Sequence, residues 1–97
     1  MGEFRVTVTD SAKKDLRKLS PELRKKLLQN LKILEISPFA TIKPIKKIKT
    51  SRKIALYRFR FSEYRVIYHI REDKVYILAV IHRRDFEKGL KSILKVG

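Results

Sequence analysis

The spacing of apolar residues predicts a strand and then two helices in the first part of the chain. Apolar and polar residues alternate over 4–8, as in a strand with one buried face. Over 12–19 the apolar residues recur at helical spacing, after three candidate N-caps. The segment SPEL, residues 20–23, begins a second helix that must end near Pro38. Its apolar stripe comprises Leu23, Leu27, Leu28, Leu31 and Leu34.

Signals for strands fill most of the second half of the chain. The lysine-rich stretch 43–53 predicts a weak strand at a sheet edge, where lysines discourage unwanted pairing. Three stronger strands follow, IALYRFRF, YRVIYHI and KVYILAVI, and their short links predict antiparallel pairing. Residues 85–96 predict a short helix that Gly89 weakens. The apolar side of that helix comprises Phe86, Leu90, Ile93 and Leu94.

Together these elements predict an α+β fold. It contains an N-terminal strand, a helical hairpin, an antiparallel β-sheet of about four strands and a short C-terminal helix. The chain has 97 residues, a length that predicts a single domain spanning 1–97.

Composition adds a large, one-sided charge to this picture. The chain has 25 Lys plus Arg against 10 Asp plus Glu, a formal net charge of +15. A charged thermophilic surface normally contains extra Glu as well as extra Lys, which is not the balance here. The excess therefore predicts a polyanionic partner: nucleic acid, an acidic protein or an anionic membrane.

Other features of the composition exclude several classes of protein. Cysteine is absent, which excludes disulfides and thiolate sites. The longest apolar run, Val75 to Ile81, is too short to cross a bilayer, and residues 1–10 contain no apolar segment of a secretory signal. We therefore expect a cytoplasmic protein without a membrane partner. Two histidines, scattered acids and three glycines form no metal-binding or phosphate-loop motif, so we expect no metal and no cofactor.

The first hairpin predicts a cluster of arginines on one face of the sheet. If Ser62 and Glu63 form a two-residue turn, Arg60 opposes Arg65, and Arg58 lies on the same face. Like charges directly opposite each other cost about 0.2–1 kcal/mol per pair. These side chains either spread into solvent or surround a bound phosphate. Phosphate is favoured because guanidinium groups pair with its oxygens in a fork geometry.

The second hairpin predicts the position of His82. If Glu72 and Asp73 form its turn, Arg65 faces Val80, and His82 lies on the arginine face. With an ordinary pKa of about 6.5, this imidazole is a candidate for proton transfer; the alternative is a hydrogen-bonded histidine at a strand end. The other face predicts the core against the helices: Tyr57, Phe59, Phe61, Tyr64, Val66, Tyr68, Ile70, Val75, Ile77, Ala79 and Ile81.

The order of elements, with the motif LYRFRFSEYRVIY and a later HRR, resembles the RelE/ParE superfamily of toxins. The usual family pattern reads roughly L-Y-R-x-R-x-G-D-Y-R-V-I-Y, then an apolar strand and H-R-R. Ser62-Glu63 replaces the usual G-D turn, and Phe86 stands where a tyrosine is usual. The matching residues are Leu56, Tyr57, Arg58, Arg60, Tyr64, Arg65, Val66, Ile67, Tyr68, His82, Arg83 and Arg84.

The resemblance implies a toxin of a type II toxin–antitoxin system. RelE-like members cut mRNA in the ribosomal A site, by metal-free attack of the RNA's own 2′-hydroxyl. For that branch it implies that Phe86 stacks on a base and that four arginines surround the scissile phosphate: Arg58, Arg60, Arg65 and Arg83. We expect further RNA contacts from Lys43, Lys46, Lys47, Lys49 and Lys53, and from Lys13, Lys14, Arg17 and Lys18 of the first helix.

Phe86 lacks the hydroxyl of the usual tyrosine, and this leaves two alternatives open. One is a ParE-like inhibitor of DNA gyrase, and the other is a catalytically impaired RNA-binding or ribosome-binding homologue. Either toxin branch implies a RelB-like acidic antitoxin, which forms a hetero-oligomer with the toxin and offsets part of its charge.

Overall fold

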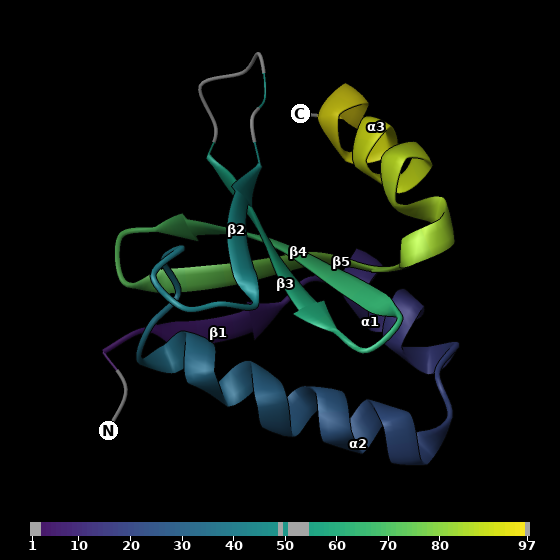
Figure 1. Cartoon of the computed structure of the whole chain (residues 1–97), viewed down its shortest axis with the longest axis horizontal. Coiled ribbons are helices and arrows are strands. Elements are labelled where there is room, and N and C mark those ends of the chain that lie inside the picture. The colour runs from purple at the N-terminus through teal and green to yellow at the C-terminus, as the bar shows by residue number, and fades with distance from the viewer. Residues whose placement is uncertain (1–2, 49, 51–54, 97) are drawn as a thin grey trace.

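The computed structural model describes residues 3–48, 50 and 55–96, which form five strands and three α-helices (Figure 1). In chain order the elements are β1 (Arg5–Val8), α1 (Asp10–Arg17), α2 (Pro21–Asn30), the 3-10 helix η1 (Leu31–Glu35), β2 (Ile45–Ile48), β3 (Leu56–Phe61), β4 (Tyr64–Arg71), β5 (Lys74–His82), the 3-10 helix η2 (Arg83–Asp85) and α3 (Phe86–Val96). No helix within these described ranges is long and apolar enough to cross a bilayer.

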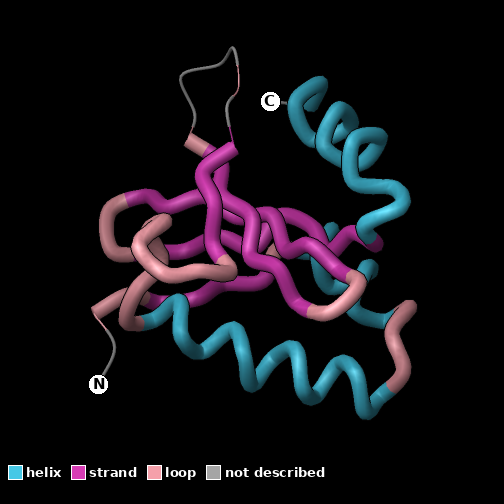
Figure 2. Tube along the Cα trace, in the orientation of Figure 1, coloured by secondary structure: helices cyan, strands magenta, loops and turns pink. Residues whose placement is uncertain are grey.

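All five strands belong to one mixed sheet with the order β1-β5-β4-β3-β2. The pairs β2–β3, β3–β4 and β4–β5 are antiparallel, whereas β1 pairs with β5 in parallel. The predicted α+β fold is confirmed, and β1 makes the sheet larger than the expected four or so strands. Helices flank the strands on both sides: α1 and α2 cover one face, and α3 lies on the other (Figure 2).

Two side-chain caps set the starts of the first two helices. Thr9 Oγ1 accepts a hydrogen bond from the Ala12 N–H at 3.3 Å and donates one to the Ile77 carbonyl at 2.7 Å, which ties α1 to β5. Ser20 Oγ accepts from the Leu23 N–H at 3.2 Å at the start of α2. The caps were predicted from the sequence because a short polar side chain at this position satisfies an otherwise free N–H.

The principal core lies between the helical hairpin and the sheet. It contains Ala12, Leu16, Leu19, Leu27, Leu31, Leu34, Ile45, Phe59, Val66, Tyr68, Val75, Ile77 and Val80. The buried Tyr68 hydroxyl donates to the Pro38 carbonyl at 2.7 Å, and burial, followed by the nearby Tyr57, raises the pKa of Tyr68 above its ordinary value. This phenol is therefore a neutral donor that anchors the loop after η1.

A smaller apolar cluster lies under α3 on the opposite face of the sheet. Its buried residues are Leu56, Ile67 and Ala79, and α3 contributes Phe86, Leu90, Ile93 and Leu94. The close approach depends on Gly89, because a Cβ atom there would lie 2.6 Å from Ile81 Cδ1. Gly89 lowers the helix propensity of this segment, but its lack of a side chain allows α3 to pack closely on β5.

A bulge in the β4–β5 pair changes which face the end of β5 presents. Tyr68 lies opposite Ile77, as predicted, but Ile67 lies opposite Ala79, so Leu78 is an extra residue on β5. Beyond this point the register is shifted by one residue, and a shift of one residue exchanges the two faces of a strand.

The bulge overturns part of the predicted core. Ala79 and Ile81 pack under α3 instead of against the helical hairpin, and Val80 belongs to the principal core. A long-range contact accompanies the shift: Asp15 Oδ2 on α1 accepts a hydrogen bond from the Val80 N–H at 2.9 Å. The prediction for these three residues of β5 was wrong because it assumed an unbroken ladder.

Candidate nucleic-acid site

The β3–β4 hairpin brings three arginines together on the face of the sheet that carries α3. Arg60 lies opposite Arg65, and Arg58 lies opposite Ile67, so the predicted register of this hairpin is confirmed. The turn between the strands places Ser62 at a φ of 53°, the left-handed conformation that tight two-residue hairpins require. The side chains of Arg60 and Arg65 are therefore forced onto neighbouring positions of one face.

Strand β2 extends this basic surface and forms one wall of a cavity of about 390 Å³. Lys46 lies opposite Arg58, and the Arg60 N–H donates to the Pro44 carbonyl at 2.9 Å, which fixes the start of β2 against β3. The residues that line the cavity are Lys43, Pro44, Lys46, Arg58, Arg60 and Arg65. This lining presents five cationic side chains and no carboxylate, so an anion is the ligand it favours.

The pKa of Arg65 reflects the high density of positive charge around it. The pKa of Arg65 lies below its ordinary value, first because the side chain is partly desolvated and then because Arg58, Arg60 and Arg83 repel its charge. Glu63 acts in the opposite direction. Arginine nevertheless stays protonated in proteins, so the repulsion persists until an anion offsets it. We call Arg58, Arg60, Arg65 and Arg83 the arginine cluster.

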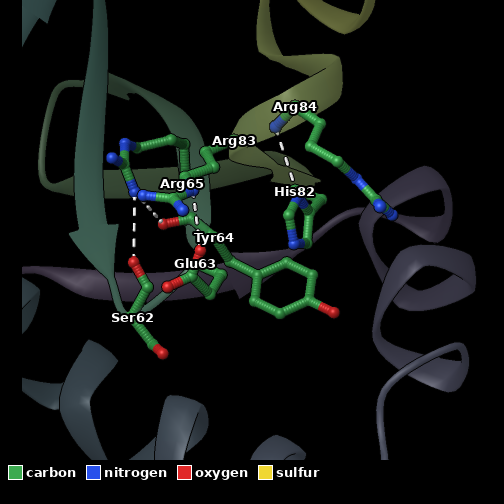
Figure 3. Close-up of polar contacts among 7 residues, drawn as sticks. All are labelled: Ser62, Glu63, Tyr64, Arg65, His82, Arg83 and Arg84. Carbon is green, nitrogen blue, oxygen red and sulfur yellow. Dashed lines mark hydrogen bonds and ion pairs between the residues drawn. The ribbon is translucent and has the colours of Figure 1, made fainter.

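The turn of the β3–β4 hairpin holds two members of this cluster (Figure 3). Arg65 Nη1 donates to the carbonyls of Ser62, at 3.3 Å, and Tyr64, at 3.0 Å. Arg83 Nε lies 2.7 Å from Glu63 Oε2, and the Arg83 N–H donates to the Glu63 carbonyl at 2.7 Å. This is the one side-chain ion pair within the described ranges.

His82 does not join the arginine cluster. Because of the bulge, Arg65 pairs with Ile81, and His82 pairs with Tyr64, whose ring centroid lies 5.2 Å from that of the imidazole in an edge-on contact. His82 Nδ1 also accepts from the Arg84 N–H at 3.2 Å. Figure 3 shows His82 and Tyr64 on the side of α1. The predicted placement of His82 on the arginine face, with Arg65 facing Val80, was wrong.

A second cavity, of about 420 Å³, lies beside His82 between α1 and α3. Its polar lining includes Asp15, Lys18, Tyr64, His82 and Arg84. No local motif predicts this cavity, since its walls come from α1, β4, β5, η2 and α3. Its mixture of acidic and basic groups distinguishes it from the wholly basic first cavity.

Phe86 connects the arginine cluster to α3. Its side chain is half-buried in the smaller apolar cluster, and the Arg58 guanidinium carbon lies 5.8 Å from the centroid of its ring. This is a cation–π distance. The residue predicted to stack on an RNA base thus lies at the border of the predicted phosphate site and already contacts one of its arginines.

The predicted RNA-binding lysines fall in several places. Lys43 and Lys46 line the basic cavity, whereas Lys47 lies opposite Tyr57 and therefore on the other face. Lys49 and Lys53 lie outside the described residues. In α1 and at its C-cap the cations are exposed but lie across the sheet from the arginine cluster: Lys13, Lys14, Arg17 and Lys18. Of the predicted RNA-binding lysines that the structure describes, Lys43 and Lys46 are the two that line the cavity with the arginines.

Comparison with known proteins places this geometry in a family. The model of the family described as the ParE toxin of type II toxin–antitoxin system, parDE, matches residues 6–86. No curated protein sequence matches the chain. Within the described ranges, no group of three or more His, Asp or Glu side chains is placed to hold a metal ion.

The fold is also similar to solved structures. The archaeal RelE–RelB complex from Pyrococcus horikoshii OT3 matches with 28% identity and a TM-score of 0.70, over 84% of this chain and 96% of that chain. The toxin–antitoxin complex RelBE2 from Mycobacterium tuberculosis matches with 27% identity and a TM-score of 0.67, over 84% of this chain and 99% of that chain.

A mutant of the E. coli toxin RelE in the free state matches over 100% of both chains, with 21% identity and a TM-score of 0.63, which concerns the fold alone. The match to the family model spans residues 6–86, which is most of the chain, and the solved toxin–antitoxin structures share its fold. The chain therefore belongs to the ParE toxin family of type II toxin–antitoxin systems, within the RelE/ParE superfamily.

Proposed function

We propose that this toxin is a ribosome-dependent mRNA endonuclease that cleaves in the A site at a phosphate bound by the arginine cluster. The observation that carries the proposal is the basic cavity of about 390 Å³, which has five cationic side chains and no carboxylate in its lining. The two similar structures above 25% identity, a RelE–RelB complex and a RelBE2 complex, support the nuclease branch of the superfamily.

In the proposed reaction the 2′-hydroxyl of the RNA attacks the adjacent phosphorus. The bond to the 5′-oxygen of the next nucleotide breaks, leaving a 2′,3′-cyclic phosphate and a 5′-hydroxyl. The phosphorane carries more negative charge than the ground state, and prearranged guanidinium groups stabilise that charge. Arg58, Arg60 and Arg65 serve this purpose from the cavity wall, with Arg83 beside them.

The arginine cluster contributes little to proton transfer. Guanidinium groups hardly deprotonate and are therefore poor bases. His82 lies on the opposite face of the sheet, so the proposal gives it no part in the reaction. Removal of the 2′-hydroxyl proton and protonation of the 5′-oxygen leaving group fall to ribosomal RNA, so the proposed cleavage requires the ribosome.

The proposal also specifies the surroundings of the reaction. Lys43 and Lys46 extend the arginine cluster along the RNA backbone, and Phe86 stacks on a base next to the scissile phosphate. The toxin acts in the cytoplasm as a single domain, where an acidic RelB-like antitoxin offsets its charge of +15 in a hetero-oligomer.

A second candidate function is inhibition of DNA gyrase without cleavage. It is favoured by the matching family model, which is that of the ParE toxin, and by Phe86, which has no hydroxyl to assist proton transfer. The partial neutralisation of Arg83 by Glu63 also fits a binding surface as well as it fits an active site.

Cleavage is tested in a matched cell-free translation system with mRNA ends mapped by primer extension. The wild type, Arg65→Ala and Arg71→Ala are compared, because Arg71 lies at the far end of the same strand and is exposed. We expect A-site cuts that fall by about a hundredfold or more in Arg65→Ala and persist in Arg71→Ala. Intact mRNA with active wild-type toxin would overturn the nuclease proposal, and loss of DNA supercoiling by gyrase would then establish the second candidate.

A further inference from the structure

The contact between Glu63 and Arg83 restrains one member of the arginine cluster. Glu63 Oε2 engages Arg83 at Nε, 2.7 Å away, which is the inner nitrogen of the guanidinium; the two terminal nitrogens form its outer end. Those two nitrogens form the fork that pairs with two oxygens of a phosphate. The Arg83 N–H also donates to the Glu63 carbonyl at 2.7 Å, so backbone and side chain fix Arg83 together.

We propose that Glu63 is a positioning residue, which holds Arg83 by its Nε so that the two terminal nitrogens face the scissile phosphate. The inference rests on the proposed function and deepens it. The turn of the β3–β4 hairpin would then orient two arginines of the cluster, because Arg65 also donates to the turn carbonyls of Ser62 and Tyr64.

A role in stability alone does not explain this contact. Both side chains are largely exposed, at 62% for Arg83 and 51% for Glu63, and exposed ion pairs contribute little to folding. A role as general base is also disfavoured, since one carboxylate oxygen of Glu63 already contacts Arg83. Orientation of Arg83 is the function that both observations support.

Glu63 also carries the negative charge that opposes the repulsion among the arginines. Its removal leaves the cluster more positive but leaves Arg83 free to rotate. Loss of Glu63 should therefore strengthen RNA binding and slow cleavage at the same time. A substitution that merely destabilised the fold would weaken both.

The test compares Glu63→Ala and Glu63→Gln with Glu72→Ala. Glu72 is the matched control because it is an exposed glutamate in the other hairpin turn, at the far end of β4. Cleavage rates are measured in the cell-free translation system over a range of pH. Affinity is measured separately with a single-stranded RNA that carries a 2′-deoxy nucleotide at the cleavage site and cannot be cut.

We expect Glu63→Ala to slow cleavage by about tenfold or more and to bind the uncleavable RNA more tightly. Glu63→Gln should recover most of the rate, because the amide oxygen still accepts from Arg83 Nε, and Glu72→Ala should cleave like the wild type. In an Arg83→Ala background, Glu63→Ala should have little further effect, since residues that act as a unit are not additive.

Several outcomes would overturn the inference. Cleavage by Glu63→Ala at the wild-type rate would show that Glu63 does not position Arg83. If Glu63→Gln and Glu63→Ala slow cleavage equally, and the cleavage rate no longer falls at acidic pH, Glu63 is a general base instead. If the wild type binds RNA without cutting it, the proposed nuclease fails; positioning then stands only if Glu63→Ala changes the affinity and Arg83→Ala removes that change.

Discussion

The two faces of the sheet differ in the side chains they carry: one is apolar, and the other combines a small apolar cluster with like-charged arginines. The face under α1 and α2 is apolar, and its buried tyrosine hydroxyl has a partner in the Pro38 carbonyl. The face under α3 has a small apolar cluster at its centre and, beside it, the arginine cluster, whose members repel one another. Folding alone would favour an acid among these arginines, and within the described ranges only Glu63 meets one of them in an ion pair.

The difference separates residues that stabilise the fold from the arginines to which we assign a role in binding. Residues of the first face lower the free energy of the folded state by burial. Arginines placed opposite each other raise it slightly, and the phosphate binding proposed above is what accounts for their arrangement. Four substitutions test this difference between the two faces.

Truncation of a leucine in the principal core should cause the largest loss of stability. Leu27 is fully buried, so Leu27→Ala removes apolar contacts and leaves a cavity that costs about 2–5 kcal/mol in the free energy of unfolding. The adjacent Leu28 is 41% exposed, and Leu28→Ala should cost far less. Urea unfolding of the two variants measures the contrast, and similar losses at both sites would contradict the described orientation of α2.

A methyl group at position 89 should loosen α3 from the second face. In Gly89→Ala the new carbon would lie 2.6 Å from Ile81 Cδ1 and 3.2 Å from two other atoms of that side chain. We expect a net loss of about 1–2 kcal/mol, because overpacking outweighs the better helix propensity of alanine.

Thermal unfolding and hydrogen exchange of α3 measure the effect of Gly89→Ala. Ser92→Ala, an exposed change on the same helix, is the control and should be close to neutral. Adding Ile81→Val, which removes the closest atom, should restore part of the loss. Unchanged protection of α3 in Gly89→Ala would show that the helix does not depend on this close approach.

Removal of one arginine from the cluster should increase stability slightly while it weakens RNA binding. Arg60→Gln relieves the repulsion from Arg65 directly opposite and should raise the free energy of unfolding by about 0.2–1 kcal/mol. The dependence of RNA affinity on salt should decrease by about one counterion. Arg71→Gln is the control for charge, and a fall in stability specific to Arg60→Gln would show that this arginine stabilises the fold.

The smallest effect concerns His69, whose ring stacks on Tyr76 at a centroid distance of 5.1 Å. Burial, and then the nearby charge of Arg71, lower the pKa of His69 below its ordinary value. The unfolded chain therefore binds this proton more readily than the folded protein does, and stability falls as the pH drops below about 6.5. Denaturant unfolding at several pH values should show a shallower decline in His69→Gln; identical slopes would exclude a contribution from His69.

Much of the fold was predictable because the signals that set it are local. Thr9 and Ser20 cap helices through neighbours three residues away, and the Ser62-Glu63 turn sets the register of β3 and β4 within a few residues. The encounter of Arg60 with Arg65 followed from that turn. The parallel pairing of β1 with β5 was not predicted, since it joins segments from opposite ends of the chain.

The facing of residues on β5 depends on contacts between segments that are far apart in the sequence. The sequence of β5 contains a continuous apolar run from Val75 to Ile81 with no sign of a break, yet the bulge at Leu78 reverses the facing of the residues that follow, including His82. Asp15, 65 positions before Val80 in the chain, accepts the Val80 N–H in this shifted register. The pairing of Arg60 with Arg65 follows from local sequence, because a tight two-residue turn sets the register of its own hairpin. Only the folded structure decided on which side His82 lies, because a helix packed on the strand takes part in setting its register.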